Sequence, residues 1–132
     1  MRKLLLLIPL ALLLAGCGGT SGGTNNPNQG HLGEKAGLVG TTLTLILKDF
    51  TITPMNAKIP KTGTYTVVLF NEGSQVHSLK IEGNGLSTQG KQINFGKSST
   101  FKVTFKKSGT YQMFCPVDSH KELGMTGTIT VA

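Results

Sequence analysis

The chain has 132 residues, which is enough for one folded domain beside a short leader. Its formal net charge is +7 at neutral pH, but the lysines are scattered, no arginine follows Arg2, and the chain has only 2 tyrosines and no tryptophan. Nucleic-acid binding therefore has little support, because such proteins gather basic and aromatic side chains on one face. We expect the lysines to be solvated or to face an acidic partner.

The first sixteen residues have the pattern of an export signal. Arg2 and Lys3 form a short positive region, and the apolar run that follows, "LLLLIPLALLLAG", is too short to cross a bilayer as a stable helix. The run ends in "LLAGC", which resembles the lipobox of bacterial lipoproteins, whose cysteine is lipidated and becomes the new N-terminus. The resemblance implies a lipoprotein signal peptide at residues 1–16 and a lipid anchor at Cys17.

A lipidated Cys17 would place the protein outside the cytoplasm. It would be held at a bacterial membrane, in the periplasm or on the outer face, because two or more acyl chains anchor a protein almost permanently. The alternative is an ordinary signal peptide that is cut nearby and leaves Cys17 as an unpaired thiol.

Residues 17–37 predict a flexible tether. After Cys17 the sequence "GGTSGGTNNPNQGHLGEKAG" is rich in glycine, asparagine and threonine and has almost no apolar side chains to bury. A flexible linker of this length spans about 25 Å. His31 lies within it and is interpreted as a solvated linker histidine.

The remaining residues, 38–132, are predicted to form an all-β domain. Their apolar segments are enriched in β-branched and aromatic residues, several alternate apolar and polar side chains, and turn-forming residues separate them. This pattern predicts an antiparallel sandwich or barrel of about seven to eight strands. We expect no helix, although residues 84–91 and 119–123 could each hold a single helical turn. The predicted strands are "TTLTLIL", "TYTVVLF", "HSLKIEG", "KQINF", "STFKVTF", "TYQMFC" and "TGTITVA".

One short loop, "FCPVDSHKELGM", carries a thiol, an imidazole and a thioether. Four residues separate Cys115 from His120, and four more separate His120 from Met125. Strand alternation before the loop places Cys115 on the same face as Tyr111 and Met113, toward the core. Soft sulfur ligands together with an imidazole select copper over calcium, magnesium or manganese.

A copper centre with two histidines, one cysteine and one methionine needs a second histidine from another strand. His77 is the only other histidine of the predicted domain, and a sandwich could bring it beside the loop. Lipidation of Cys17 also leaves Cys115 without an internal disulfide partner, so burial or a bound metal must protect its thiol. The alternative is a buried structural Cys115, a surface His120, and a His77 and a Met125 that only fill the core.

The loop resembles the C-terminal signature of the cupredoxins, the small blue copper proteins, and the likeness covers residues 38–132. It implies a Greek-key β-sandwich with one type 1 copper per chain. His77 and His120 would be the equatorial nitrogen ligands, Cys115 the thiolate, and Met125 the weak axial ligand. The residues that carry the signature are Gly109, Tyr111, Cys115, His120, Gly124, Met125, Gly127, Ile129 and Val131.

The resemblance implies electron transfer. The protein would carry single electrons between redox protein partners that the sequence does not identify, with the outward edge of His120 as their route. We expect a monomer and no enzymatic activity, because the catalytic copper oxidases and nitrite reductases need further histidine clusters. Storage of copper, or its delivery to an oxidase, is the alternative function, and a metal-free adhesive or structural sandwich is a third.

Three departures from the family pattern leave the reduction potential open. Ser78 stands where many relatives have an asparagine that ties the two ligand loops together, and Met113 replaces a common phenylalanine. Asp118 and Ser119 stand where proline and glycine are frequent. The charge of Asp118 near the copper would lower the potential, whereas a drier and less hydrogen-bonded surround would raise it.

Overall fold

The computed structural model describes residues 35–132, which contain ten strands and no helix. The predicted signal peptide, the lipidated Cys17 and the tether around His31 lie outside the described residues. An all-β sandwich is confirmed, with ten strands instead of seven to eight. The described part of the chain offers no helix that is long and apolar enough to cross a membrane. The strands are β1 (Gly37–Val39), β2 (Thr42–Lys48), β3 (Thr51–Thr53), β4 (Asn56–Ile59), β5 (Gly63–Asn71), β6 (Lys80–Gly83), β7 (Leu86–Gln89), β8 (Ser98–Phe105), β9 (Gly109–Phe114) and β10 (Thr126–Val131).

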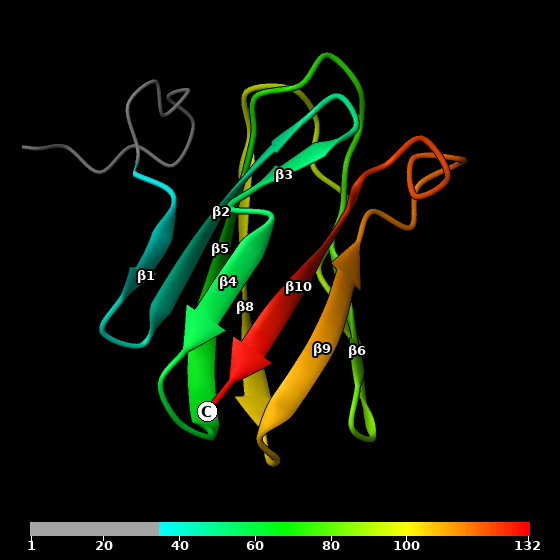
Figure 1. Ribbon diagram of the computed structural model, residues 1–132. Helices are drawn as coiled ribbons and strands as arrows, with labels where there is room; N and C mark the ends of the chain where they lie inside the picture. Colours follow the sequence, from blue (N-terminus) through cyan, green and yellow to red (C-terminus); the bar gives the residue numbers. More distant parts are fainter. Residues whose placement is uncertain (1–34) are drawn as a thin grey trace, which may run out of the picture.

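Two five-stranded sheets form the two layers of the sandwich (Figure 1). The first sheet has the order β1-β2-β5-β8, with β3 paired to the free part of β2. The second sheet has the order β4-β10-β9-β6-β7. Strands β2, β5 and β10 are rich in threonine, valine, leucine and isoleucine, which suit a pleated and half-buried surface.

Both sheets are mixed, whereas the sequence predicts antiparallel pairing. β2 pairs in parallel with β5, and β4 pairs in parallel with β10. The chain passes from β3 into the second sheet as β4 before it returns to the first sheet as β5. Parallel neighbours require a crossover connection of this kind, so the prediction of antiparallel pairing was wrong for these two pairs.

The sequence pattern does not predict the short strands β1, β3, β4 and β7, because three or four residues give too little alternation. Residues 84–91 do not form a helical turn but hold strand β7 and the turn of the β6–β7 hairpin. Its turn residues Asn84 and Gly85 have φ values of 51° and 84°, as two-residue hairpin turns require. Residues 91–95 are no strand and contribute only the bridge between His77 and Ile93.

The hydrophobic core lies between the sheets and comes from alternate residues of the long strands. Leu43, Leu45 and Leu47 of β2 are fully buried, because every second side chain of a strand points to the same face. Burial of one such leucine stabilises the fold by about 1.5–3 kcal/mol. Phe105 of the first sheet and Tyr111 of the second pack edge to face, with ring centroids 4.9 Å apart.

Three connections meet at one end of the sandwich. They are the two-residue turn at 49–50 between β2 and β3, residues 72–79 between β5 and β6, and residues 115–125 between β9 and β10, which are orange in Figure 1. Side-chain hydrogen bonds join these connections to one another. This end of the molecule holds the residues that the sequence predicts as metal ligands.

Candidate metal centre

Cys115 lies directly after β9 and is fully buried, on the same face as Tyr111 and Met113, as the alternation predicts. Its amide donates a hydrogen bond to the carbonyl of Met125 at 3.0 Å. The two ends of the loop are therefore held by the same antiparallel pairing that joins β9 to β10.

Residues 115–125 form a series of tight turns, and one of them is the predicted single helical turn at 119–123, in which the Leu123 amide donates to the carbonyl of Ser119 at 3.1 Å. The His120 amide donates to the carbonyl of Val117 at 3.1 Å, and the Met125 amide donates to the carbonyl of His120 at 3.0 Å. Gly124 has a φ of 102°, which a glycine adopts readily. The loop reverses on itself, and His120 is only 3% exposed.

His77 belongs to the connection between β5 and β6. Its amide and carbonyl exchange hydrogen bonds with Ile93, at 3.1 and 2.8 Å. The side chain is fully buried. The backbone pairing therefore fixes the position of a buried imidazole, and the sandwich brings it to the β9–β10 loop as the sequence predicts.

Three donor atoms meet in a small triangle inside the domain. Nδ1 of His77 lies 3.2 Å from Nδ1 of His120, and Sγ of Cys115 lies 3.8 Å and 3.5 Å from these two nitrogens. Typical metal–imidazole and metal–thiolate bonds of about 2.0–2.3 Å would separate three donors in a trigonal plane by about 3.5–3.8 Å. The triangle therefore has nearly the dimensions of a trigonal metal site.

The outer nitrogen of each histidine faces an oxygen acceptor. Nε2 of His77 lies 2.9 Å from Oδ1 of Asp49, and Nε2 of His120 lies 3.1 Å from Oε1 of Gln75. Carboxylate and amide oxygens only accept, so each Nε2 carries the proton and each Nδ1 presents its lone pair toward Cys115. Two such lone pairs 3.2 Å apart repel each other unless a cation lies between them. The donor set therefore fits a metal ion.

Met125 belongs to the same site. It is fully buried and packs in the same core cluster as Cys115. Its backbone is hydrogen-bonded to both Cys115 and His120. A thioether in this position suits the long and weak axial bond of a copper centre with two imidazoles and one thiolate.

Residues 32–131 match the family model of the cupredoxin-like domain. This chain belongs to the cupredoxin family. His77, Cys115, His120 and Met125 accordingly have the arrangement of a type 1 copper site. A comparison with curated proteins finds no significant match.

Solved cupredoxin structures share the fold. A dithionite-reduced auracyanin from the photosynthetic bacterium Roseiflexus castenholzii is 22% identical, with 72% of this chain and 99% of that chain covered and a TM-score of 0.64. Auracyanin A, a "blue" copper protein from Chloroflexus aurantiacus, is 14% identical, with 69% and 99% covered and a TM-score of 0.58. A purple cupredoxin from Nitrosopumilus maritimus is 23% identical, with 67% and 98% covered and a TM-score of 0.50.

The carboxylate that contacts a ligand histidine in this cupredoxin is Asp49, a residue that the sequence does not single out. Hydrogen bonds from the Ser74 hydroxyl, and then from His77, hold the pKa of Asp49 well below its ordinary value, so the side chain is charged at neutral pH. Asp118 is exposed on the ligand loop, and within residues 35–132 no described hydrogen bond or ion pair joins it to a ligand.

Gln75 makes the tie between the two ligand loops of this cupredoxin. It precedes His77 by two residues, and its side chain accepts from His120. Ser78 donates its hydroxyl instead to the carbonyl of Gly90 at 2.8 Å. The sequence could not show this exchange of roles, because the reach of Gln75 depends on how the two loops lie in space.

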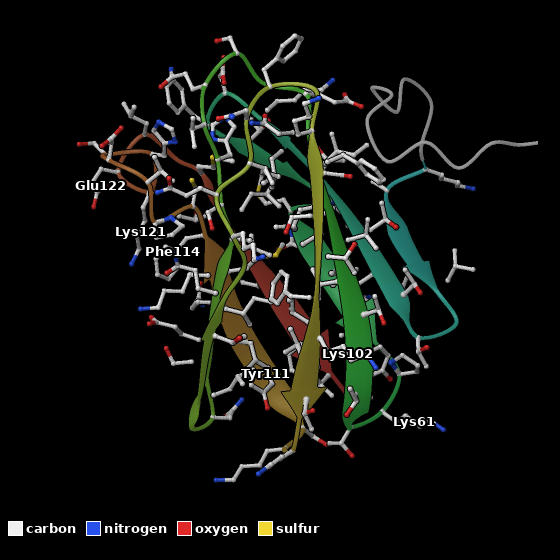
Figure 2. The ribbon with its side chains drawn as sticks, turned by 180° about the vertical axis from the view of Figure 1, so that it is seen from behind. Lys61, Lys102, Tyr111, Phe114, Lys121 and Glu122 are labelled. Atoms are coloured by element: carbon white, nitrogen blue, oxygen red, sulfur yellow. The ribbon has the colours of Figure 1, made fainter. Side chains whose placement is uncertain are left out.

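A cation covers the outer face of the strand that leads to Cys115. Phe114 points away from the centre of the sandwich, and Nζ of Lys121 lies 4.0 Å from its ring centroid. Figure 2 shows the two side chains next to each other at the ligand loop. Such a contact contributes about 0.5–1 kcal/mol at an exposed site, which helps to hold the loop against β9.

Proposed function

We propose that this cupredoxin carries single electrons between redox protein partners through one mononuclear type 1 copper. The observation that carries the proposal is the buried triangle of two Nδ1 atoms and one Sγ, with edges of 3.2, 3.5 and 3.8 Å. In this proposal His77 and His120 are the equatorial nitrogen ligands, Cys115 is the equatorial thiolate, and Met125 is the axial ligand.

A bound copper would supply a one-electron couple, and the chain would supply a rigid and dry site. The three equatorial ligand residues are at most 3% exposed, so water has little access to the donor atoms. His77 is fixed by its pairing with Ile93, and Cys115 by its pairing with Met125. A site that changes little between oxidation states suits electron transfer, because little reorganisation accompanies each step.

We propose an electron carrier and not an enzyme, because the described residues 35–132 gather one cluster of metal-binding side chains. The route for electrons in this proposal is the outer edge of His120. Gln75 and Phe50 lie against that edge, so electrons would cross the hydrogen bond to Gln75 or the ring of Phe50. Leu123 and Val76, 58% and 36% exposed, offer an apolar surface for redox partners.

The location is also part of the proposal. A lipidated Cys17 would hold the protein at an extracytoplasmic membrane surface of a bacterium, and the predicted tether would let the domain reach its partners. We propose a monomer that binds no nucleic acid, since the lysines of the chain are scattered.

The visible spectrum tests the copper site. The full chain, purified in detergent, is titrated with Cu²⁺ and compared with Cys115→Ser. We expect an intense blue thiolate-to-copper band that saturates at one equivalent and is absent from the variant. Cyclic voltammetry of the loaded chain should then show a reversible one-electron couple.

A weak band that does not depend on Cys115 would overturn the electron-carrier proposal. Rapid loss of copper to a mild chelator would favour copper delivery, because a delivery site must release its metal. The enclosed ligands predict slow loss instead.

A further inference from the structure

The two-residue turn between β2 and β3 contacts both ligand histidines. Lys48 pairs with Thr51, so Asp49 and Phe50 alone form the turn. Oδ1 of Asp49 lies 2.9 Å from Nε2 of His77. The Phe50 ring packs against the His120 ring, with centroids 5.1 Å apart and planes at 71°.

The position of the Asp49 carboxylate is fixed from several sides. The Ser74 amide donates to Oδ2 at 3.0 Å, the Ser74 hydroxyl donates to the same oxygen, and the Gln75 amide donates to Oδ1 at 3.2 Å. These three donors come from the connection that carries His77 itself. The carboxylate therefore joins the β2–β3 turn to residues 72–79, the first ligand loop.

Gly73 allows this close approach. A Cβ atom at Gly73 would lie 2.8 Å from Nε2 of His77 and would also collide with the carboxylate of Asp49. Real Cβ atoms essentially never come so close, so any larger residue would push the carboxylate and the imidazole apart. The absence of a side chain at residue 73 is thus part of the contact between Asp49 and His77.

The turn itself is held in a strained backbone conformation. Phe50 has a φ of 67°, which is uncommon for a bulky residue and is found where surrounding contacts impose it. Here those contacts are the His120 ring on one side and the hydrogen bonds of Asp49 on the other. The geometry of the turn is therefore tied to the geometry of both ligands.

The contact has an electrostatic consequence that differs between the two histidines. His77 donates to a negative carboxylate, whereas His120 donates to the neutral amide of Gln75. A carboxylate behind an imidazole fixes its tautomer and makes the other nitrogen a stronger donor. Since cupric copper carries one more positive charge than cuprous copper, a nearby carboxylate stabilises the cupric state more.

We infer that Asp49 is a positioning residue that orients Nδ1 of His77 toward the metal and biases the copper site toward its cupric state. This inference rests on the proposed function. The Asp49 side chain is 32% exposed, so solvent screens part of its charge. We expect its removal to lower the affinity for Cu²⁺ relative to Cu⁺ about tenfold, which is a rise in reduction potential of about 59 mV for a one-electron couple.

Voltammetry of the full chain in detergent tests this inference with two Asp49 variants and one control. Asp49→Asn keeps an oxygen that can accept from His77 but removes the charge, and Asp49→Ala removes both. Asp118→Asn removes a charge from the ligand loop itself, at an exposed residue. We expect all variants to keep the blue band, Asp49→Asn to raise the potential as above, and Asp118→Asn to shift it far less.

A second measurement uses the metal-free chain. Nitrogen-15 NMR should show His77 with its proton on Nε2 in the wild type and in Asp49→Asn, and a mixture of tautomers in Asp49→Ala. Equal potentials of Asp49→Asn and Asp118→Asn, or an unchanged His77 tautomer in Asp49→Ala, would overturn the inference and leave the blue copper site standing. If the wild type shows no blue band that depends on Cys115, the proposed function itself is overturned.

Discussion

Gln75 accepts a hydrogen bond from Nε2 of His120 at 3.1 Å, so a side chain from the first ligand loop covers the outer edge of a ligand on the second. The two residues are 45 positions apart in the sequence. Gln75 thereby both ties the loops together and separates His120 from solvent.

Loss of this cover should open the copper site to small ligands. In Gln75→Ala the ring of His120 loses its hydrogen-bond acceptor, so added imidazole can displace it more easily. We expect the imidazole concentration that halves the blue band to fall several-fold. Gln92→Ala, which removes another exposed glutamine, is the control and should leave this concentration unchanged. Equal titration curves for both variants would contradict this role of Gln75.

Bound copper should stabilise the fold. A ligand that binds only the folded state at about a hundred times its Kd raises the free energy of unfolding by about 2.7 kcal/mol. For a domain of about 100 residues this is a rise in Tm of about 10–20 °C. The Tm of the metal-free chain, compared with the Tm of the chain whose single site is filled with Cu²⁺, measures the effect. Cys115→Ser should lose most of it, and an equal rise in that variant would argue against the thiolate as a ligand.

Two glycine substitutions should separate stability from metal binding. A Cβ at Gly127 would press on the carbonyl of Met55 and lie 2.7 Å from Cε of Met113, and a Cβ at Gly73 would press on Asp49 and His77. We expect Gly127→Ala and Gly73→Ala each to lower the free energy of unfolding by about 1–3 kcal/mol. Only Gly73→Ala should also weaken Cu²⁺ binding in a competition titration. Equal copper affinities would show that Gly73 serves packing alone.

One acidic residue on β6 should make the stability of the metal-free chain depend on pH. Lys80 donates to Glu82 at 2.6 Å and holds the pKa of Glu82 below its ordinary 4.5. A group with a lowered pKa in the folded state stabilises the fold above its unfolded pKa, and this contribution is lost as the pH falls through the folded pKa. Urea unfolding at pH 7 should therefore give Glu82→Gln a lower free energy of unfolding than the wild type. This difference should be smaller at about pH 3.

The control for this pH effect is Glu122→Gln, which neutralises an exposed glutamate on the ligand loop instead. Its loss of unfolding free energy relative to the wild type should change less between the two pH values than that of Glu82→Gln. The same pH dependence in both variants would mean that net charge, and not the pair with Lys80, is responsible.

Membrane attachment should depend on one thiol. If Cys17 is lipidated, the wild-type chain partitions into the detergent phase of a two-phase extraction and the membrane fraction of cells. Cys17→Ser should move the protein into the aqueous phase, or leave it as an uncleaved precursor. An unchanged membrane fraction with a cleaved Cys17→Ser chain would rule out the lipid anchor.

Much of the ligand set could be predicted from the sequence because its signals are local. Alternation along β9 buries Cys115 beside Met113, and the spacing of His120 and Met125 on the same loop marks them as its companions. Asp49 could not be found in this way. It lies 28 residues before His77, in a two-residue turn that becomes visible only once β2 and β3 are paired.

The strand count was underestimated for a similar reason. β3 and β4 have three and four residues, and Pro54 and Met55 separate them. Their pairing comes from partners far along the chain, β2 and β10, so neither strand has enough periodicity of its own to be recognised. The long strands β2, β5 and β8, which have seven to nine residues each, were predicted within one or two residues of their observed ends.

The place of β10 between β4 and β9 has a consequence for the order of assembly. Thr128 bonds to Asn56, which lies 72 positions earlier in the chain, so the second sheet closes only after a long segment has been ordered. Pairings over such distances are slow to form. The same strand holds the end of the loop that carries Cys115, His120 and Met125. Metal loading should therefore follow folding, and a partly folded chain should present its thiol to oxidants before copper can protect it.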